Sequence, residues 1–600
     1  MQKSTSNVQA MVWSFYDLMR QQGVSTDQYD QIMLKMMAIY ALSIKDELPN
    51  GIEFTKDLAD YKGEWLALVE ALKVSEDSQV QAVFSSDDIL EKLPTPLVHG
   101  LITTLLAYPA ESVGSLAVDV MSLMTLNSSL SKPNNYAHMS VYQLVNKILG
   151  NKQNQSLYGN SEQALPICVE ASQKSGAVYY EAINPLGMIA DALSLMSPHR
   201  FTTSYTDYLK RPGYTSFENE LRQFDCGASF PPMGMKVPRN AYDDKSTFDR
   251  FGLKTMRMEV LNILHLIKQC RDTVVTSVSE SILFSTTEKE FRQYLVDNGM
   301  LKAVISLPSD IWAGTSVKTS LVVIEPEGNN KSVRFLDITK TDFIEKTTKR
   351  LVGLTDLDKI LSCLNSEEEL DCAISTPQQE IQKKEYSLDA GKYVLDFKEK
   401  KLRNILKESE TVVLDKIVRF ERGLPFKPEE GDCTILEVTV NDLNDIVDIT
   451  TPTKEVKISP SEHAKNKAGF LQPNDIVLVL QGSAGKLGLV PENVPTTDDE
   501  SWMVNKSAIV IRVTSDMIDP RALYAYLTSD IGQTQLSSIT QGAVIANISL
   551  KELRNLPIIV PSLEEQKKAI ALIDNSRSTQ KTIQTLLAEL DAQKNDLWNL

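Results

Sequence analysis

Apolar positions near the N-terminus follow a helical spacing, and further along the chain they form short strand-like runs. In residues 8–44 they recur every three or four positions, which predicts two helices. From about residue 93 to residue 324, short apolar runs alternate with helical stretches, a pattern typical of a parallel α/β sheet. From residue 412, short strands separated by Gly, Pro and Asn follow. Residues 564–600 hold neither proline nor glycine, which predicts one long helix.

The patterns predict an α/β protein with a helical N-terminal cap, a Rossmann-like domain, an α+β domain and a long C-terminal helix. A charged, helical stretch that begins near residue 339 is interpreted as a connector between two functional halves. We expect five parts: a helical domain 1–92, the α/β domain 93–345, the connector 346–410, the α+β domain 411–563 and the final helix 564–600.

Composition places the chain among ordinary globular proteins, with 42% hydrophobic and 24% charged residues. No apolar run approaches the roughly 20 residues that cross a bilayer, and the N-terminus lacks a secretory pattern. Six dispersed cysteines without a CxxC pair and five scattered histidines predict free thiols, a cytoplasmic location and no metal site. The net charge of −17 argues against a general nucleic-acid coat protein, although a local basic face can still bind DNA.

Strand ends in the α/β region carry the candidate binding residues. A first strand at 155–158 leads into Gly159, whose lack of a side chain would let the backbone approach a ligand. The next strand, 177–180, ends in Glu181, where nucleotide-type folds hold ribose hydroxyls. Asp207 follows a third strand at 201–205. Both acids are as often ordinary solvent-facing residues, and the loop offers one glycine where two or three are usual.

The fourth strand ends in an unusual tip. Residues 221–235 read LRQFDCGASFPPMGM, so the apolar run stops at Phe230-Pro231-Pro232-Met233. Two prolines hold a backbone rigidly at such a tip. The phenyl ring of Phe230 cannot accept a hydrogen bond from an amine.

The C-terminal third offers a hairpin and a helix seam. The stretch Gly482-Ser483-Ala484-Gly485-Lys486 lacks the order of a phosphate-binding loop, and a glycine-flanked hairpin is the favoured interpretation. In the final helix, heptad positions hold apolar residues with one interruption at Gln593. This helix either packs on its own domain or pairs with another helix. The seam residues are Ile583, Leu590 and Leu597 on one side and Leu586 and Leu600 on the other.

Several stretches, in order and at suitable distances, together resemble the type I restriction–modification family, with modification and specificity subunits joined in one chain. Similar to the modification subunit are the N-terminal helical pair, KAVISLPSDIWAGTSVKTSLVVI at 302–324 and YSLDAGKY at 386–393. Similar to one target-recognition domain and one conserved-region helix are FLQPNDIVLVLQGSAGKLGLV at 470–490, GAVIANIS at 542–549 and LPIIVPSLEEQ at 556–566.

The resemblance implies an adenine-N6 DNA methyltransferase scaffold. In that family the tip reads Asn/Asp-Pro-Pro-Phe/Tyr: the polar residue accepts from the target amine and the aromatic stacks on a base swung out of the duplex. Here Phe230 replaces the polar residue, and Met233 replaces the aromatic. The resemblance also puts Gly159 in the S-adenosylmethionine loop, Glu181 at the ribose and Asp207 near the target amine or cofactor.

Three functions follow from these features. The leading hypothesis is a sequence-specific DNA-recognition protein of a restriction–modification or phage-defence system on a degenerate methyltransferase scaffold, with no cofactor. The second is an active methyltransferase using S-adenosylmethionine, and the third is an assembly protein without DNA contact. Expected partners are double-stranded DNA, a second chain or different subunit through the C-terminal helix, and a nuclease, helicase or other effector, with no membrane. Candidate DNA contacts are Arg419, Arg422, Lys427, Lys486, Lys506 and Arg521.

Overall fold

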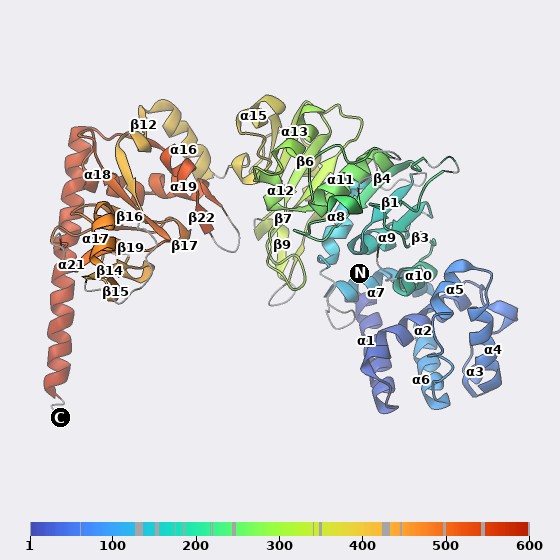
Figure 1. The fold of residues 1–600 in the computed structure, drawn as a ribbon. Coiled ribbons are helices and arrows are strands. Elements are labelled where there is room, and N and C mark those ends of the chain that lie inside the picture. The colour runs from blue at the N-terminus through green and yellow to red at the C-terminus, as the bar shows by residue number, and fades with distance from the viewer. Residues whose placement is uncertain are drawn as a thin grey trace. The chain divides into compact units, whose positions relative to one another are not determined.

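The protein forms two compact units, Met1–Val394 and Leu395–Leu600, and each is described by itself (Figure 1). The structure is a computed structural model. It describes residues 2–60, 62–126, 136–150, 155–174, 176–183, 187–216, 218, 220–242, 248–339, 341–346, 351–395, 397–422, 433–443, 447–495, 500–541 and 546–597.

A nine-stranded sheet is the centre of the first unit, with the strand order β11-β8-β6-β7-β5-β4-β1-β2-β3. Strands β7 and β11 run antiparallel to their neighbours, and the other pairs are parallel. Because β1, β2 and β4 are parallel neighbours, their carboxyl ends lie at one edge of the sheet. The strands are β1 Leu157–Asn160, β2 Val178–Glu181, β3 Thr202–Ser204, β4 Phe224–Ser229, β5 Cys270–Ser279, β6 Leu301–Ser306, β7 Thr319–Ile324, β8 Ser332–Asp337 and β11 Ala373–Pro377.

Helices cover both faces of this sheet. The N-terminal helices share one hydrophobic core with one face, where Leu157 and Ala228 point, while α11 packs with Tyr158 and Phe224 on the other. The adjacent residues Leu157 and Tyr158 of β1 therefore serve opposite cores, as a pleated strand requires. In β4, Phe224 and Ala228 serve opposite cores because the register shifts between Phe224 and Cys226. The helices of this unit are α1 Gln2–Gln21, α2 Tyr29–Ile44, α3 Asp57–Asp60, α4 Lys62–Lys73, α5 Ser78–Phe84, α6 Thr95–Leu106, α7 Val113–Leu126, α8 Met139–Leu149, α9 Leu165–Ala171, α10 Gly187–Met196, α11 Met258–Gln269, α12 Glu280–Phe284, α13 Lys289–Asp297, α14 Leu357–Asn365 and α15 Gln378–Lys383.

Among the residues that the structure describes, no single helix has the length and apolar character needed to span a membrane. One strongly bent pair, α6 with residues 110–126, meets those criteria only when its two parts are taken together.

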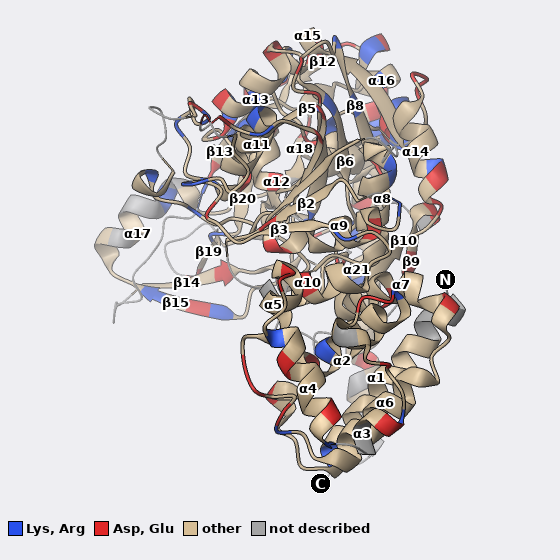
Figure 2. Ribbon diagram, turned by 90° about the vertical axis from the view of Figure 1, so that its right-hand side faces the viewer, with Lys and Arg blue, Asp and Glu red and all other residues tan. Residues whose placement is uncertain are grey.

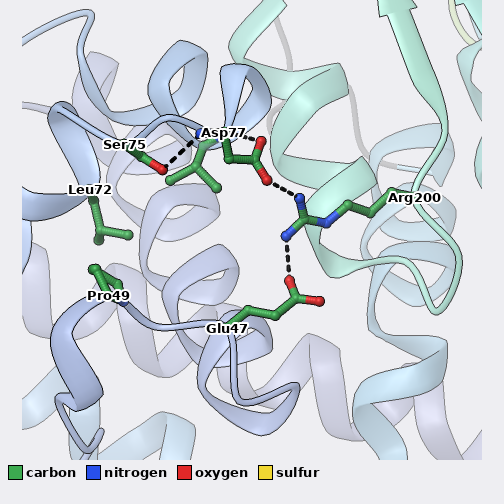
Figure 3. Close-up of a pocket in the computed structure, with 7 residues that line it drawn as sticks. Glu47, Pro49, Leu72, Ser75, Asp77 and Arg200 are labelled. Atoms are coloured by element: carbon green, nitrogen blue, oxygen red, sulfur yellow. Dashed lines mark hydrogen bonds and ion pairs between the residues drawn. The ribbon is translucent and has the colours of Figure 1, made fainter.

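Charged side chains join the N-terminal helices to the turn between α10 and β3. The Arg200 guanidinium pairs with the carboxylates of Glu47 and Asp77 (Figure 3). Close by, the Lys45 ammonium donates to the carbonyl oxygens of Leu195 (2.7 Å) and Ser197 (2.5 Å). The two carboxylates of the Figure 3 pocket, about 500 Å³, are therefore occupied by Arg200 in holding the cap onto the α/β layer.

The structure confirms the predicted fold class, including the strands that end at Glu181 and before Phe230. It also corrects the content of the predicted connector. Strand β11 lies in that stretch and pairs with β8, and the Tyr393 ring stacks on Phe335 at 4.0 Å. A two-stranded ribbon of β9 Ile344–Lys346 and β10 Val352–Leu354 precedes them. The five-part division itself stays a prediction.

The second unit contains several small sheets and one long helix. A four-stranded sheet has the order β13-β20-β16-β18, and three-stranded sheets have the orders β15-β14-β19 and β17-β22-β21. Strands β16 and β18 form the predicted hairpin, in which Gly482 and Gly485 adopt positive φ angles of 85° and 91°. The predicted C-terminal helix is confirmed as α21, Leu563–Leu597.

The remaining elements of this unit are short. Strands β12 and β23 form an antiparallel two-stranded sheet. The strands are β12 Thr411–Val413, β13 Val418–Glu421, β14 Cys433–Val438, β15 Lys454–Ile458, β16 Ile476–Val479, β17 Gln481–Gly482, β18 Leu487–Leu489, β19 Ser501–Val504, β20 Ala508–Val513, β21 Thr540–Gln541, β22 Ala546–Ile548 and β23 Pro557–Ile559. The helices before α21 are α16 Phe397–Glu408, α17 Pro460–Asn466, α18 Pro520–Thr528, α19 Asp530–Ser538 and α20 Leu550–Arg554.

Candidate functional site

The tip of β4 places an aromatic ring in the hydrophobic core. Phe230 directly follows β4 and is 0% exposed. Its ring centroid lies 4.9 Å from that of Tyr142 and 5.7 Å from that of Trp312. Its backbone N–H donates to the Ser161 hydroxyl at 3.1 Å. The side chain at this position therefore contributes packing and offers no acceptor to an amine.

The rest of the tip is held from the side of α11. Pro231 is buried, Pro232 is exposed and Met233 is half-buried. The backbone N–H of Gly234 donates to the carboxylate of the fully buried Glu259 at 3.2 Å. The two prolines and this bond restrict the backbone of the tip, and the side chains of Phe230 and Met233 are apolar.

Gly159 lies in strand β1, which corrects its predicted place in the loop after the strand. The strand runs two residues further than predicted, to Asn160. A Cβ atom on Gly159 would lie 2.4 Å from the Cys168 sulfur, so glycine here allows α9 to pack on β1. The turn that follows starts at Ser161, whose φ of 86° is a conformation that favours glycine. Ser161 therefore carries a side chain where the backbone at the sheet edge favours glycine, and its hydroxyl accepts from the Phe230 N–H at the β4 tip.

Glu181 ends β2 as predicted, and hydrogen bonds from its own chain surround its carboxylate. The side chain is 0% exposed. It accepts from the Tyr158 hydroxyl at 2.6 Å, from the Gly213 N–H at 2.6 Å and from the Thr206 hydroxyl. Burial raises the pKa of the Glu181 carboxyl above its ordinary value, and these three bonds oppose that rise. A Cβ atom on Gly213 would lie 2.9 Å from the carboxylate, so the covering loop needs glycine at this point.

A buried relay of hydrogen bonds continues from Tyr158 to the segment after β3. The Tyr158 hydroxyl lies 3.0 Å from His265 Nε2, and His265 Nδ1 lies 2.8 Å from the Arg250 guanidinium. Arg250 also donates to the carbonyl oxygens of Tyr208 and Leu209, each at 2.6 Å. Burial, with the charge of Arg250, lowers the pKa of His265 well below its usual value.

The relay fixes the proton positions. Arg250 can only donate, so the neutral His265 ring accepts at Nδ1 and carries its proton on Nε2. That proton is donated to the Tyr158 oxygen, whose own O–H is donated to Glu181. Each donor in this series of hydrogen bonds therefore meets an acceptor, from Arg250 through His265 and Tyr158 to Glu181.

Asp207 caps a turn. Its carboxylate accepts from the backbone N–H groups of Leu209 at 3.2 Å and Lys210 at 3.4 Å. It lies after β3 as predicted, and its role near an amine or cofactor stays a prediction.

The residues that the resemblance assigns to S-adenosylmethionine do not fit that cofactor in this arrangement. Hydroxyl and amide donors of the chain take the Glu181 oxygens that a ribose would need. The Cys168 sulfur fills the space above Gly159. Among the described residues of this edge, the buried Oδ1 of Asn160 has no partner, and the Asn160 amide nitrogen donates to Asn262 at 3.0 Å. One amide oxygen cannot replace a carboxylate as the acceptor for both ribose hydroxyls.

His265 and Arg250 were not singled out in the sequence. His265 lies in the apolar run LNILHLIK of α11, where a lone histidine indicates a satisfied core residue. For Arg250, the sequence feature that could have indicated a buried role is its position between two phenylalanines, Phe248 and Phe251.

The predicted DNA contacts of the second unit differ in accessibility. Arg419 in β13 is exposed and pairs with Glu421 at 2.5 Å, and Arg422 and Lys506 are exposed. Lys486 is half-buried and donates to a backbone carbonyl at 3.4 Å. Lys427 lies outside the described residues. Further lysines lie on β15, where they appear in blue in Figure 2.

Arg521 is engaged within its own unit. Its guanidinium pairs with Asp519 at 3.1 Å and with Asp574 of α21 at 3.3 Å. These two carboxylates raise the pKa of Arg521. Its predicted contact with DNA stays untested, but the geometry assigns it first to holding α18 on α21.

Helix α21 packs on its unit along one part and is exposed along another. Ile573 is buried, and the Gln566 side chain donates to the backbone at Met517 and Pro561, both at 3.0 Å. Further along, four apolar residues are about half exposed. They are Ile583, Leu586, Leu587 and Leu590. Of the other seam positions, Leu597 lies where no side chain is described and Leu600 lies outside the described residues.

Comparisons with known proteins agree with this architecture. A family described as N-6 DNA methylase matches residues 195–402, which include the β4 tip but begin after Gly159 and Glu181. The type I restriction modification DNA specificity domain matches residues 427–592.

Individual relatives cover smaller parts. The type I restriction enzyme MpnII methylase subunit of Mycoplasma pneumoniae is 29% identical over 160 residues, which are 26% of this chain and 30% of that protein. The type I restriction enzyme EcoBI specificity subunit of Escherichia coli is 26% identical over 141 residues, 22% of this chain and 28% of that protein. The chain thus spans less than a third of the length of either relative.

A solved structure supports the fold. The type I restriction-modification system methyltransferase subunit from Streptococcus thermophilus superposes with a TM-score of 0.54 at 18% identity, over 64% of this chain and 98% of that one. The chain therefore joins an N-6 DNA methylase domain to a type I restriction–modification DNA specificity domain in one polypeptide, as the resemblance predicted.

Proposed function

We propose that this protein recognises a specific DNA sequence in a restriction–modification or phage-defence system, and that its methylase domain serves as a scaffold that does not transfer methyl groups. The observation that carries the proposal is the buried ring of Phe230 at the β4 tip. A positioned acceptor at such a tip stabilises charge that develops on the amine, an effect worth roughly 3–4 kcal/mol for one hydrogen-bonding group in comparable sites. A phenyl ring supplies none of it.

The arrangement around Glu181 supports the same proposal. A ligand would have to break hydrogen bonds to Tyr158, Thr206 or Gly213 before it could use this carboxylate. Leaving a buried donor without its acceptor costs about 1–3 kcal/mol. The carboxyl edge of the sheet thus disfavours binding of S-adenosylmethionine at Glu181, and its β4 tip lacks a side chain that accepts from an amine.

The specificity domain would read DNA. Arg419, Arg422 and Lys506 are exposed cations that suit phosphates, and Lys486 lies in the β16–β18 hairpin. One such domain reads one half-site. Pairing of two chains through the exposed apolar part of α21 would create a two-part target. A partner nuclease, helicase or other effector would then act on the bound DNA.

Two measurements on the full chain test this function. Selection from a random duplex library should enrich one motif, and incubation of that duplex with labelled S-adenosylmethionine should leave it unlabelled. Absence of an enriched motif, with no salt-dependent retention of duplex DNA, would favour the pure assembly protein.

The second candidate is an active adenine-N6 methyltransferase. The N-6 methylase match across the tip favours it, since the two prolines and their rigid backbone remain. Labelled methyl groups on the selected duplex would establish this candidate and overturn the scaffold. Calorimetry with S-adenosylmethionine separates the two earlier, because micromolar binding belongs to the enzyme alone.

A further inference from the structure

A pocket of about 610 Å³ lies next to the β4 tip, on the segment that leads from the tip into α11. Two short stretches of this segment are paired. The Val237 N–H donates to the Met256 carbonyl at 2.7 Å, and the Met258 N–H donates to the Met235 carbonyl at 3.0 Å. The pocket therefore has a hydrogen-bonded frame, and its volume lies in the range that accommodates a small ligand.

Cations dominate the wall of this pocket. Among the described residues, Lys236, Arg239, Lys254 and Arg257 line it, with one carboxylate, Glu288. Glu288 is 8% exposed and accepts from the Thr255 hydroxyl at 3.2 Å, so it is directed into the protein. Four cations and one enclosed acid in the described lining, with Glu259 beside Arg257, are an unusual concentration of positive charge in a chain with a net charge of −17. The pocket is suited to an anion.

Arg257 is the fixed member of the set. One guanidinium nitrogen donates to the hydroxyls of Ser279 at 3.2 Å and Ser281 at 2.8 Å, and Nε lies 3.3 Å from the Glu259 carboxylate. Nε itself is buried and has no hydrogen-bond partner among the described residues. An arginine that is already ordered loses little side-chain entropy when it meets a phosphate.

Other lining residues of the pocket are aromatic and apolar. Tyr242 and Phe251 are both buried and meet edge to face, with ring centroids 5.4 Å apart. The Tyr242 hydroxyl donates to the Thr255 carbonyl, and the Arg250 guanidinium lies 4.6 Å from the Phe251 ring centroid, so both rings are held in place. Leu253 and the half-exposed Met256 complete the wall. Such a surface suits a planar base or a sugar.

We propose that this pocket binds a nucleoside phosphate, with the phosphate on Lys236, Arg239, Lys254 and Arg257 and the base against the apolar wall. The ligand is either a free nucleotide or one nucleotide of a single strand, which present the same chemistry. The proposal is independent of the DNA-recognition function, because it involves no residue of the second unit.

Calorimetry of the full chain with adenosine monophosphate tests the pocket. The double variant Lys236→Gln/Lys254→Gln should weaken binding at least tenfold, since it removes two of the four cations of the lining, and both side chains are exposed. The matched control is Lys268→Gln, an exposed lysine at the other end of α11, which should keep the wild-type affinity. Equal affinity of the double variant and the control would overturn the site.

Further ligands identify the chemical class and the source. Inorganic phosphate should bind at least tenfold more weakly than adenosine monophosphate, and equal binding would overturn the nucleoside part of the proposal. A short single-stranded oligonucleotide that competes with the nucleotide would assign the pocket to a strand, and failure to compete would assign it to free nucleotides. No binding of either ligand at millimolar concentration would overturn the proposal. S-adenosylmethionine has no phosphate and should not compete, so its result tests the scaffold function separately.

Discussion

The carboxyl edge of the sheet and the exposed part of α21 differ in how their functional groups are satisfied. At the sheet edge, Glu181 and Tyr158 are buried and bonded to groups of the same chain. On α21, Leu586 and Leu590 are more than half exposed and spaced as helix seams are. The first region resembles a binding site that the chain has filled with its own side chains. The second resembles an interface whose other half is missing.

This difference predicts how substitutions in the two regions will act. A buried polar group that is fully bonded contributes to specificity of folding and has little left for a ligand. An exposed apolar seam costs solubility unless something covers it. We therefore expect substitutions at the sheet edge to change stability, and substitutions on α21 to change association.

Replacing Phe230 by Asn should produce the largest effect. The change removes a ring packed between Tyr142 and Trp312 and buries an amide in its place, so the free energy of unfolding should fall by about 3–5 kcal/mol. Urea unfolding followed by fluorescence and circular dichroism measures it. Met235→Asn, at a half-exposed site five residues later, should cost less than about 1 kcal/mol. A stable Phe230→Asn variant that methylates DNA would show that the edge is a dormant active site.

The double variant Leu586→Asp/Leu590→Asp should weaken self-association at least about 100-fold, because each buried leucine contributes roughly 1.5–3 kcal/mol and 1.4 kcal/mol is tenfold. Sedimentation over a concentration series measures the change. Ala588→Asp is the control, since it adds one negative charge, as each of the two leucine substitutions does, to an exposed position away from the seam. If the unmodified chain is monomeric at every concentration, the seam is covered by a different subunit or by nothing.

Glu181 should make stability depend on pH. Burial raises its pKa in the folded protein above the ordinary value of 4.5. Its stabilising contribution is therefore complete below that value and is lost as the pH rises through the higher folded-state pKa. The Gln variant stays neutral throughout, so the free energy of unfolding of wild type minus that of Glu181→Gln should decrease with rising pH, by roughly 1.4 kcal/mol for each unit of pKa difference.

Urea midpoints at a series of pH values measure this decrease. The exposed acid of Glu218→Gln provides the control, whose difference from wild type should stay nearly constant. A difference for Glu181 that grows with pH would mean that the carboxylate is stabilised in its charged form.

The sequence predicted the strand ends better than their surroundings. Glu181 and Phe230 were placed correctly because buried strands have a clear apolar pattern that stops where the chain leaves the sheet. Gly159 was misplaced because β1 extends two residues further, and a strand's end has no marker when polar residues are buried there.

The closed network could not be predicted at all. Its bond between Tyr158 and His265 joins residues 107 positions apart, and no local pattern indicates such a pairing. Helix α11, which supplies His265, and strand β5, which pairs with β4, were likewise not predicted. Local periodicity identifies elements, but tertiary packing decides which polar groups meet.

The smallest effects should appear in DNA affinity. Arg422→Gln and Lys506→Gln each remove one exposed cation from the specificity domain, so each should weaken binding of the selected duplex about three- to tenfold. Each should also reduce the slope of log affinity against log salt by about one. Fluorescence anisotropy between 50 and 200 mM salt, a range chosen because phosphate contacts are sensitive there, measures both quantities.

Arg521→Gln gives the internal comparison for these variants. Its guanidinium is already paired with Asp519 and Asp574, so its loss should change duplex affinity less than about twofold and should instead loosen α18 from α21. If Arg521→Gln reduces affinity and the salt slope as much as Arg422→Gln does, the arginine exchanges its carboxylate partners for phosphates on binding. The second unit would then also contain an internally bonded site that a ligand can open, and the contrast with the Glu181 network would be one of degree.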